Sequence, residues 1–200
     1  MSTWIPALRG VGAKLETGAT VADIGCGHGA STILLAQAFP RSRFFGYDNH
    51  APSIQHARQA AAEAGVTDRV TFEVAAATDY PAQESGYDLI AFFDCFHDLG
   101  TPVEVATHAA VTLAKEGTVL LVEPIAGEHI EDNLNPVGRL FSAGSILCCT
   151  PNALASGGLA LGNQATDQQL REVWHAGGLS SFRSAQPSQS LVIRGSQVVA

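Results

Sequence analysis

Residues 21–29 read Val-Ala-Asp-Ile-Gly-Cys-Gly-His-Gly, an apolar run that passes directly into a turn with three glycines. Glycine tolerates positive φ angles and lets a ligand approach the backbone closely. A helical pattern begins at residue 30, and the first N–H groups of a helix lack partners and bind polar or anionic groups. The sequence therefore predicts a strand, a tight turn and a helix that together bind a nucleotide-like molecule.

Beyond this turn, short apolar runs alternate with stretches of helical period. Such alternation is typical of βαβ units around a mostly parallel sheet with helices on both faces. The strand-like runs are Val21–Ile24, Arg43–Tyr47, Arg69–Val74, Asp88–Phe93 and Thr118–Glu123, and the helix-like stretches are Ala30–Phe39, Pro52–Ala64 and Pro102–Leu113. We expect a single α/β domain over residues 1–200.

Two threonines are followed, three residues later, by a glutamate or glutamine, a pattern that predicts a capping box at a helix start. The pairs are Thr101 with Glu104 and Thr166 with Gln169. The helix after Thr166 is expected to end at Gly177-Gly178. Two further runs, Ser181–Ala185 and Ser190–Arg194, flank a Gln-Pro-Ser turn and predict a hairpin at the sheet edge.

The composition excludes several classes of protein. With 46% hydrophobic residues and a net charge of −8, the chain has material for a core and repels nucleic acids and anionic membranes. No apolar run reaches the length of a membrane span, and the N-terminus lacks the pattern of a signal peptide, so we expect a cytoplasmic protein. The four cysteines show no zinc or disulfide pattern, and we assign them no chemistry.

Asp48, which closes the second predicted strand, lies about 20 residues after the glycine turn, the spacing of an acid that binds ribose hydroxyls. Together with Asp23 inside the glycine motif, this pattern resembles class I S-adenosylmethionine-dependent methyltransferases over nearly the whole chain. The resemblance implies a Rossmann-like fold, a seven-stranded, mostly parallel sheet with an antiparallel last strand, and S-adenosylmethionine as cofactor.

The resemblance also implies which residues touch the cofactor. Gly25 and Gly27 would flank its methionine part and Asp48 its ribose. The family's adenine-side acid after the third strand is absent, which leaves backbone groups of Ala76 and Ala77, or Asp79, for the adenine. The remaining expected contacts are Asp23, Cys26, Asn49, Asp94 and Cys95.

His97 follows the fourth predicted strand, and Glu123 ends the fifth. Ligands gather at the carboxyl ends of such strands, and an imidazole beside a carboxylate can serve as a general base near neutral pH. The region resembles that of small-molecule O-methyltransferases, which implies that His97 is the base and Glu123 its flanking acid. Leu99 replaces the family's tryptophan, and the second flanking glutamate falls near Gln164. Asp98 suits either the chemistry or the start of the following helix.

Residues 94–98, Asp-Cys-Phe-His-Asp, together with residues 131–139 resemble the methyltransferase half of actinobacterial proteins with an N-terminal winged-helix domain. We expect the dimerising N-terminal domain of the related O-methyltransferases to be absent here, and a homodimer stays open. Residues 126–165 form an insert whose uncharged half predicts an apolar pocket wall. Asn133, Asn135 and Arg139 are candidates for polar contacts to a substrate.

These patterns predict methyl transfer to a small, hydrophobic, hydroxyl-bearing molecule, while oxygen, nitrogen and carbon acceptors all stay open. The alternative is a non-catalytic S-adenosylmethionine-binding module of a regulator. A Tyr-x-x-x-Lys reductase is excluded because no tyrosine has a lysine four residues later. We expect no metal, since Glu131-Asp132-Asn133 fits a solvated acidic loop better than a metal cluster.

Overall fold

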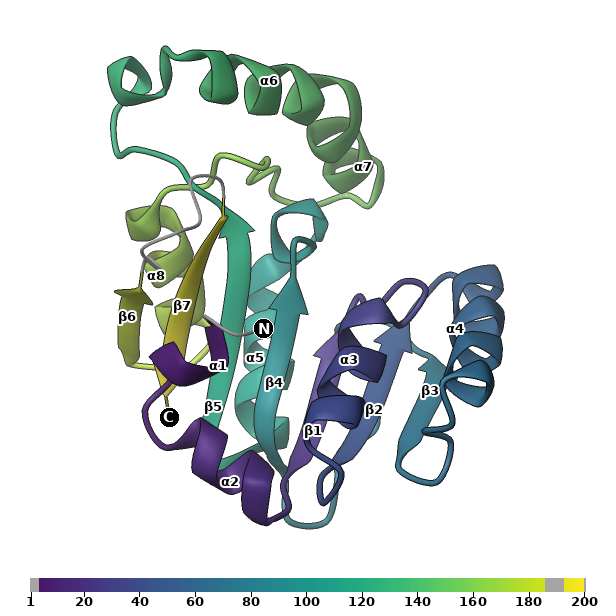
Figure 1. The fold of residues 1–200 in the computed structure, drawn as a ribbon. Helices are drawn as coiled ribbons and strands as arrows, with labels where there is room; N and C mark the ends of the chain where they lie inside the picture. Colours follow the sequence, from purple (N-terminus) through teal and green to yellow (C-terminus); the bar gives the residue numbers. More distant parts are fainter. Residues whose placement is uncertain (1–3, 186–192, 200) are drawn as a thin grey trace.

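The computed structural model describes residues 4–185 and 193–199 as an α/β fold around one central sheet (Figure 1). The strand order is β3-β2-β1-β4-β5-β7-β6. The part from β3 to β5 is parallel, whereas β7 is antiparallel to both β5 and β6. The strands are β1 (Thr20–Ile24), β2 (Arg43–Asp48), β3 (Val70–Val74), β4 (Tyr87–Phe93), β5 (Leu113–Pro124), β6 (Ser181–Ala185) and β7 (Ile193–Val199). The predicted Rossmann-like α/β fold with a parallel sheet is confirmed.

Helices cover both faces of this sheet (Figure 1). One core contains buried residues of the first four helices, and the other contains those of α5 and α8. Strand residues alternate between the two cores, as period-two geometry requires: Leu89 and Ala91 join the first core, Ile90 and Phe92 the second. The helices are α1 (Trp4–Ala7), α2 (Val11–Thr17), α3 (Ala30–Ala38), α4 (Ala51–Glu63), α5 (Pro102–Thr112) and α8 (Asp167–Ala176).

The predicted boundaries hold to within two residues for most elements. One exception is β5, which begins at Leu113 instead of Thr118, because a register irregularity lets Tyr87 pair with Leu113 while Leu89 pairs with Thr118. β6 begins and ends where the sequence predicts it. The predicted end of the second hairpin strand is also wrong: the sequence places it at Arg194, but β7 (Ile193–Val199) runs on to Val199 because it pairs with β5 as far as Thr118. Residues 190–192 and the Gln-Pro-Ser turn lie outside the described residues.

The insert folds into helices that lie beyond the carboxyl ends of β4 and β5 (Figure 1). The sequence predicts its position but not its helices. It contains η2 (Ile130–Asn133), α6 (Pro136–Gly144), the π-helix η3 (Ser145–Cys149) and α7 (Thr150–Ala155). The insert therefore forms a roof over the edge of the sheet where ligands of such folds bind.

The two threonine caps differ in the structure. Thr166 accepts a hydrogen bond from the Gln169 N–H at 3.2 Å, and Gln169 Oε1 accepts one from the Thr166 N–H at 2.9 Å, which confirms the capping box. Thr101 precedes α5 as predicted, but its side chain makes no capping bond. We expect Thr166→Ala to lower the free energy of unfolding by about 1 kcal/mol and Thr101→Ala by less than about 0.5 kcal/mol in urea denaturation. Equal losses would contradict the assignment.

Candidate active site

The turn after β1 is built from glycines that the backbone requires. Gly25, Gly27 and Gly29 have φ angles of +68°, +52° and +79°. A Cβ atom on Gly25 would lie 2.8 Å from Cys95 Sγ, whereas one on Gly27 would meet no atom within 4 Å. The backbone is therefore packed against Cys95 at Gly25 and accessible to a ligand at Gly27, as a ligand-binding turn requires.

Asp48 holds this turn to the end of β2. Its Oδ2 accepts a hydrogen bond from the Gly27 N–H at 2.9 Å, and its Oδ1 accepts one from the His50 N–H at 2.8 Å. A carboxylate offers about four acceptor positions, so each oxygen keeps capacity for a further donor. Asp48 can accept hydrogen bonds from ligand hydroxyls without giving up its backbone contacts.

Asp23 lies beneath the turn and is 1% exposed. Its Oδ2 accepts hydrogen bonds from the hydroxyls of Ser31 and Thr32, both at 2.6 Å, while its Oδ1 is buried without a hydrogen-bond partner. Burial raises the pKa of this carboxyl to about 6, and the two hydroxyls offset only part of the effect. Asp23 thus joins β1 to the first turn of α3, and its Oδ1 can still accept a hydrogen bond.

We expect Asp23→Asn to stabilise the ligand-free chain at pH 8. The pKa of Asp23 is about 6 when folded and about 3.9 when unfolded, so the ionised group costs about 3 kcal/mol well above pH 6 and nothing well below pH 4. The neutral amide avoids this cost, and the gain in urea denaturation should shrink as the pH falls toward 4. A gain that does not change with pH would contradict the assignment.

A cavity of about 180 Å³ lies between this turn and the ends of the neighbouring strands. Five predicted cofactor residues line it, namely Gly25, Asp48, Asn49, Ala77 and Cys95. Five residues that the sequence did not assign to the cofactor also line it, namely Tyr47, Ala75, Asp98, Leu99 and Asn152. Asn152 comes from the roof, and its Nδ2 donates to the Asp98 carbonyl at 3.3 Å. No local sequence signal marks a contact between segments this far apart.

The other predicted cofactor residues do not line this cavity. Asp23 and Cys26 are buried beneath the turn, and Cys26 belongs to the core on the α3 side. Gly27 lies in the glycine turn, and its N–H donates a hydrogen bond to Asp48 Oδ2. Ala76 and Asp94 are exposed. Asp94 adopts a φ of +54° and donates its N–H to the Val122 carbonyl at 2.7 Å, so a strained backbone links the ends of β4 and β5.

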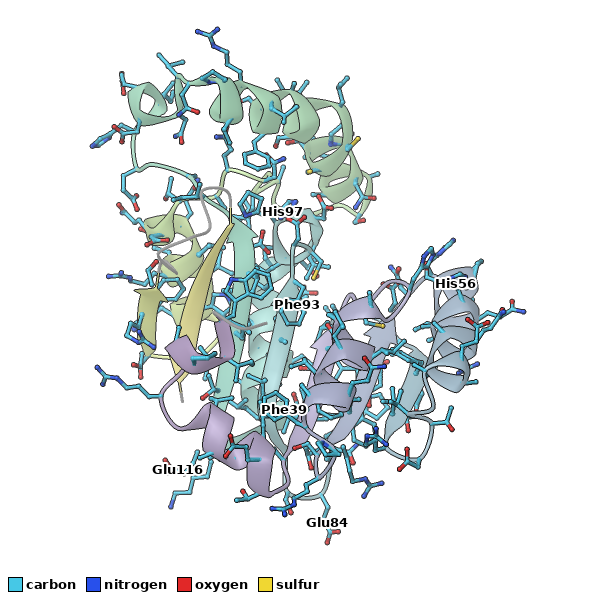
Figure 2. The ribbon with its side chains drawn as sticks, in the orientation of Figure 1. Phe39, His56, Glu84, Phe93, His97 and Glu116 are labelled. Atoms are coloured by element: carbon cyan, nitrogen blue, oxygen red, sulfur yellow. The ribbon has the colours of Figure 1, made fainter. Side chains whose placement is uncertain are left out.

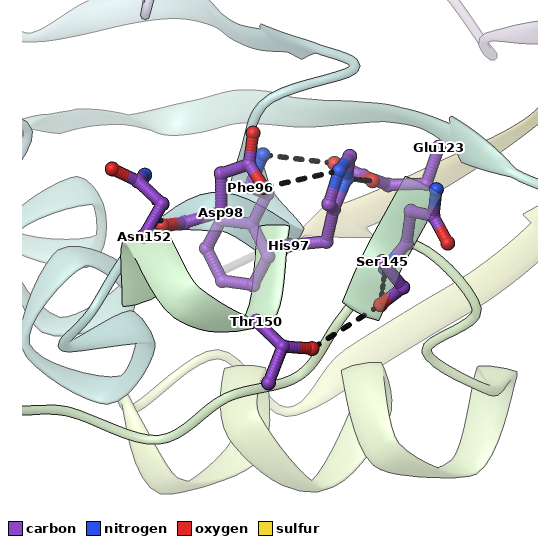
Figure 3. A network of polar contacts seen from close by, with 8 residues as sticks. Phe96, His97, Asp98, Glu123, Ser145, Thr150 and Asn152 are labelled. Atoms are coloured by element: carbon purple, nitrogen blue, oxygen red, sulfur yellow. Dashed lines mark hydrogen bonds and ion pairs between the residues drawn. The ribbon is translucent and has the colours of Figure 1, made fainter. Parts of the chain in front are cut away.

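His97 and Glu123 meet at the carboxyl ends of β4 and β5, facing the roof (Figures 2 and 3). His97 is 4% exposed and Glu123 2%. His97 Nδ1 forms a hydrogen bond with Glu123 Oε2, and Glu123 Oε1 accepts another from the Phe96 N–H at 2.9 Å. Because an ionised carboxylate only accepts, Nδ1 carries the proton of neutral His97 and Nε2 keeps its lone pair.

The surroundings of His97 shift its pKa in opposite directions. Burial disfavours the imidazolium, but the hydrogen bond and charge of Glu123 outweigh burial, with help from Asp98 and Asp94, and raise the pKa of His97 above its usual value. Burial also raises the pKa of Glu123, and His97 opposes that rise. His97 Nε2 lies 3.5 Å from Asp98 Oδ1. Glu123 thus fixes the orientation of the His97 ring, and His97 Nε2 is the atom that can accept a proton.

A second cavity, of about 400 Å³, lies where β5 leads into the roof. It is lined by Ile125, Ala126, Gly127, Asp132, Asn133, Asn135, Val137 and Gly138. Asn133 Oδ1 accepts a hydrogen bond from the Gly127 N–H, and Asn133 Nδ2 donates one to the Gly127 carbonyl. Asn135 caps α6 by accepting a hydrogen bond from the Gly138 N–H. Both side chains therefore make structural contacts in addition to any contact with a ligand. Arg139 is exposed on α6, and Gln164 accepts a hydrogen bond from the Ser142 hydroxyl at 2.6 Å.

The acidic stretch at residues 131–133 does not gather metal ligands. Asp132 accepts from the His129 N–H, and Asn133 binds Gly127. Within the described residues, the side chains grouped closely enough to hold a metal are His97 with Asp98 and Cys149, and His97 with Asp94 and Glu123. In the same part of the chain, no helix has the length and apolar character to cross a membrane.

Comparisons with known proteins agree with this geometry. A family model described as a methyltransferase domain matches residues 15–172. The 27-O-demethylrifamycin SV methyltransferase of Amycolatopsis mediterranei is 30% identical over 131 residues, which are 62% of this chain and 48% of that protein. A trans-aconitate 2-methyltransferase of Azoarcus is 48% identical over 46 residues, 23% of this chain and 18% of that protein.

A solved structure shares the fold. A Nostoc punctiforme protein described as a candidate O-methyltransferase superposes with a TM-score of 0.72 at 22% identity, covering 91% of this chain and 52% of that one. This chain thus spans about half the length of that protein, and at most about half of the two curated relatives. The family match covers most of the chain, including the glycine turn and the His97–Glu123 pair. The chain therefore belongs to the methyltransferase domain family, and its cofactor is S-adenosylmethionine.

Proposed function

We propose that this chain transfers the methyl group of S-adenosylmethionine to a hydroxyl oxygen of a small, hydrophobic acceptor, with His97 as general base. The observation that carries the proposal is the buried contact of His97 Nδ1 with Glu123, which is itself held by the Phe96 N–H. It leaves Nε2 free to accept the hydroxyl proton as the oxygen becomes nucleophilic. The related rifamycin enzyme, whose name places its methyl group on oxygen, supports the choice of acceptor atom.

The residues around the glycine turn fit the cofactor. S-adenosylmethionine, when bound, supplies an electrophilic methyl group on a sulfonium. Asp48 retains acceptor capacity for ribose hydroxyls, and Gly27 presents a backbone with no side chain above it. The cavity wall at Ala75 and Ala77 suits an adenine ring held by apolar contact and backbone groups. Four further residues that the sequence assigns to the cofactor do not line the cavity, and they would support the residues that do. They are Asp23, Cys26, Ala76 and Asp94.

The roof supports a hydrophobic acceptor. Its exposed apolar side chains belong to η2, α6, η3 and α7 and the short links between them, and include Ile130, Leu134, Leu140, Ile146, Leu147 and Leu154. Residues 140–166 contain no charged side chain. A roof of this kind favours an apolar molecule that reaches the sheet edge with its hydroxyl toward His97. A non-catalytic binding module has no need of the buried His97–Glu123 pair, whose desolvation costs free energy.

The proposal is tested with a panel of small hydroxyl-bearing acceptors and methyl-labelled S-adenosylmethionine, with product and S-adenosylhomocysteine measured together. We expect labelled methyl ether products from an apolar acceptor. A chain that binds S-adenosylhomocysteine but methylates no oxygen in the panel, while methylating nitrogen or carbon analogues, contradicts the proposal.

Once an acceptor is known, the dependence of kcat on pH tests the role of Glu123. Neutral His97 is the active form, so the rate should be lost as the pH falls through a pKa above the ordinary value of about 6.5. In Glu123→Gln the negative charge beside His97 is gone and burial dominates its pKa. The acidic limb of the kcat–pH curve should therefore move to lower pH, and the maximal kcat at high pH should fall. A lower plateau with an unmoved limb would give Glu123 a merely structural role.

A further inference from the structure

Two electron-rich atoms face each other at the end of β4 with no hydrogen bond between them. His97 Nε2, the nitrogen left unprotonated by the contact with Glu123, lies 3.5 Å from Asp98 Oδ1. Asp98 Oδ1 is buried and has no hydrogen-bond partner. A positive charge between the lone pair and the carboxylate oxygen, either a proton on Nε2 or a metal cation, turns their repulsion at this distance into attraction.

A thiol completes this arrangement from the roof. Cys149, at the end of η3, offers its Sγ, and the ligand atoms of His97, Asp98 and Cys149 all lie within 4.8 Å of one another. Cys149 is 9% exposed. The hydrogen bond from Asn152 Nδ2 to the Asp98 carbonyl holds α7 against η1 (Phe96–Asp98), and Figure 3 shows both residues. Cys149 precedes Asn152 by three residues in the same helical stretch, so the two share a helix face.

We infer that His97 Nε2, Asp98 and Cys149 form a binding site for Zn²⁺. Nitrogen, carboxylate oxygen and thiolate sulfur are the ligands that zinc prefers, and bonds of about 2.0–2.3 Å at tetrahedral angles separate such ligands by about 3.3–3.7 Å. The observed 3.5 Å between His97 and Asp98 already meets this spacing. Cys149 Sγ lies within 4.8 Å of both atoms and must approach them to this spacing, and the thiol loses its proton on binding.

The surroundings are those of a metal-binding histidine. Such a histidine usually donates its other ring N–H to a carboxylate, which fixes the tautomer and strengthens the ligand. Glu123 has this position on Nδ1, and the Phe96 N–H orients Glu123 in turn. Three protein ligands leave the fourth tetrahedral position to water. A hard cation such as Mg²⁺ is disfavoured, because it seeks six oxygen ligands.

The site has a consequence for the proposed reaction. A lone pair on Nε2 can bind a metal or accept a proton, but not both at once. Zn²⁺ should therefore inhibit methyl transfer, and a chelator should restore it. The binding site is independent of the proposed function, whereas this inhibition rests on it.

The test uses the full chain, dialysed against micromolar ZnCl₂ and analysed for bound metal, with MgCl₂ as comparison. Cys148 is exposed and adjacent to Cys149, so Cys148→Ala is the matched control for Cys149→Ala. We expect near-stoichiometric Zn²⁺ in the parent chain and in Cys148→Ala, a loss of at least tenfold in affinity in Cys149→Ala and His97→Ala, and no retained Mg²⁺. Co²⁺ should give a thiolate charge-transfer band that Cys149→Ala abolishes.

Two results overturn the inference: no stoichiometric Zn²⁺ in the parent chain, or an equal loss in Cys148→Ala and Cys149→Ala. Circular dichroism of each variant checks that a lost site is not a lost fold. If the chain has no affinity for Zn²⁺ but transfers methyl groups in the presence of a chelator, only the metal site is refuted. Zn²⁺ binding in a chain that methylates nothing refutes only the proposed function.

Discussion

His97→Ala should lower kcat for the methylated acceptor by about 10²–10⁴-fold, the range for removal of a positioned general base. His97 is absent from the cavity at the glycine turn, so the dissociation constant of S-adenosylhomocysteine should change by less than about twofold, within the ±0.5 kcal/mol typical of residues outside a site. Stopped assays of product at saturating acceptor measure the first quantity, and calorimetric titration measures the second.

His108→Ala is the matched control. His108 is partly buried, and its Nε2 bonds the Tyr80 carbonyl at 2.8 Å, a contact that involves neither His97 nor Glu123. It should keep kcat within a few-fold. Added imidazole should restore part of the rate to His97→Ala, because a small base can occupy the vacated space. Unchanged kcat in His97→Ala would remove His97 from the chemistry altogether.

Asp48→Ala should weaken binding of S-adenosylhomocysteine by about 10–100-fold, since each hydrogen bond to a charged group contributes about 1.5–3 kcal/mol. The variant removes the carboxylate expected on the ribose. It also frees the Gly27 and His50 N–H groups that Asp48 now binds, so the turn loses its anchor on β2. Calorimetric titration with the product avoids turnover and measures the loss directly.

Asp88→Ala provides the comparison at the other end of the sheet. Asp88 Oδ2 accepts from the Thr20 N–H at 2.9 Å where β1 begins, so this variant also removes a carboxylate from a backbone N–H. It should cost stability without changing cofactor affinity. If both variants weaken binding alike, the effect of Asp48 is on the fold and not on the cofactor.

The fold is largely predictable from the sequence because its signals are local. The glycines of residues 25–29 require positive φ angles, and alternation along the strands sorts residues such as Leu89 and Ile90 into opposite cores. The Thr166 capping box is a contact over three residues, and it forms as the sequence indicates. Where a contact spans a few residues, its chemistry is visible in the chain itself.

Most of the missed features depend on tertiary contacts. The start of α6 has a local signal that sequence reasoning missed, because Asn135 caps the helix and Pro136 follows at its first position. From residue 140 to residue 166 no charged side chain marks a solvent-facing side of the helices that follow. Asn152 reaches Asp98 across 54 residues, and Cys149 comes close to His97 because α7, which follows η3 directly, lies on η1. The short helix α2 follows Gly10, which has no side chain that could cap it. Sequence reasoning therefore found the glycines and Asp48, but it did not find Asn152 and Cys149, whose positions depend on how the roof packs on the sheet.

The π-helical turn in the roof lets this segment absorb a change in chain length. A π turn contains about one residue more than an α turn, so it accommodates an extra residue while the helices on either side keep their faces. Deleting one residue within Ser145–Cys149 would therefore leave a continuous α-helix from α6 to α7 in which Asn152 still faces Asp98. Cys149 belongs to the turn itself, so a single-codon deletion would displace the thiol beside His97 while the contact between the roof and the sheet is kept.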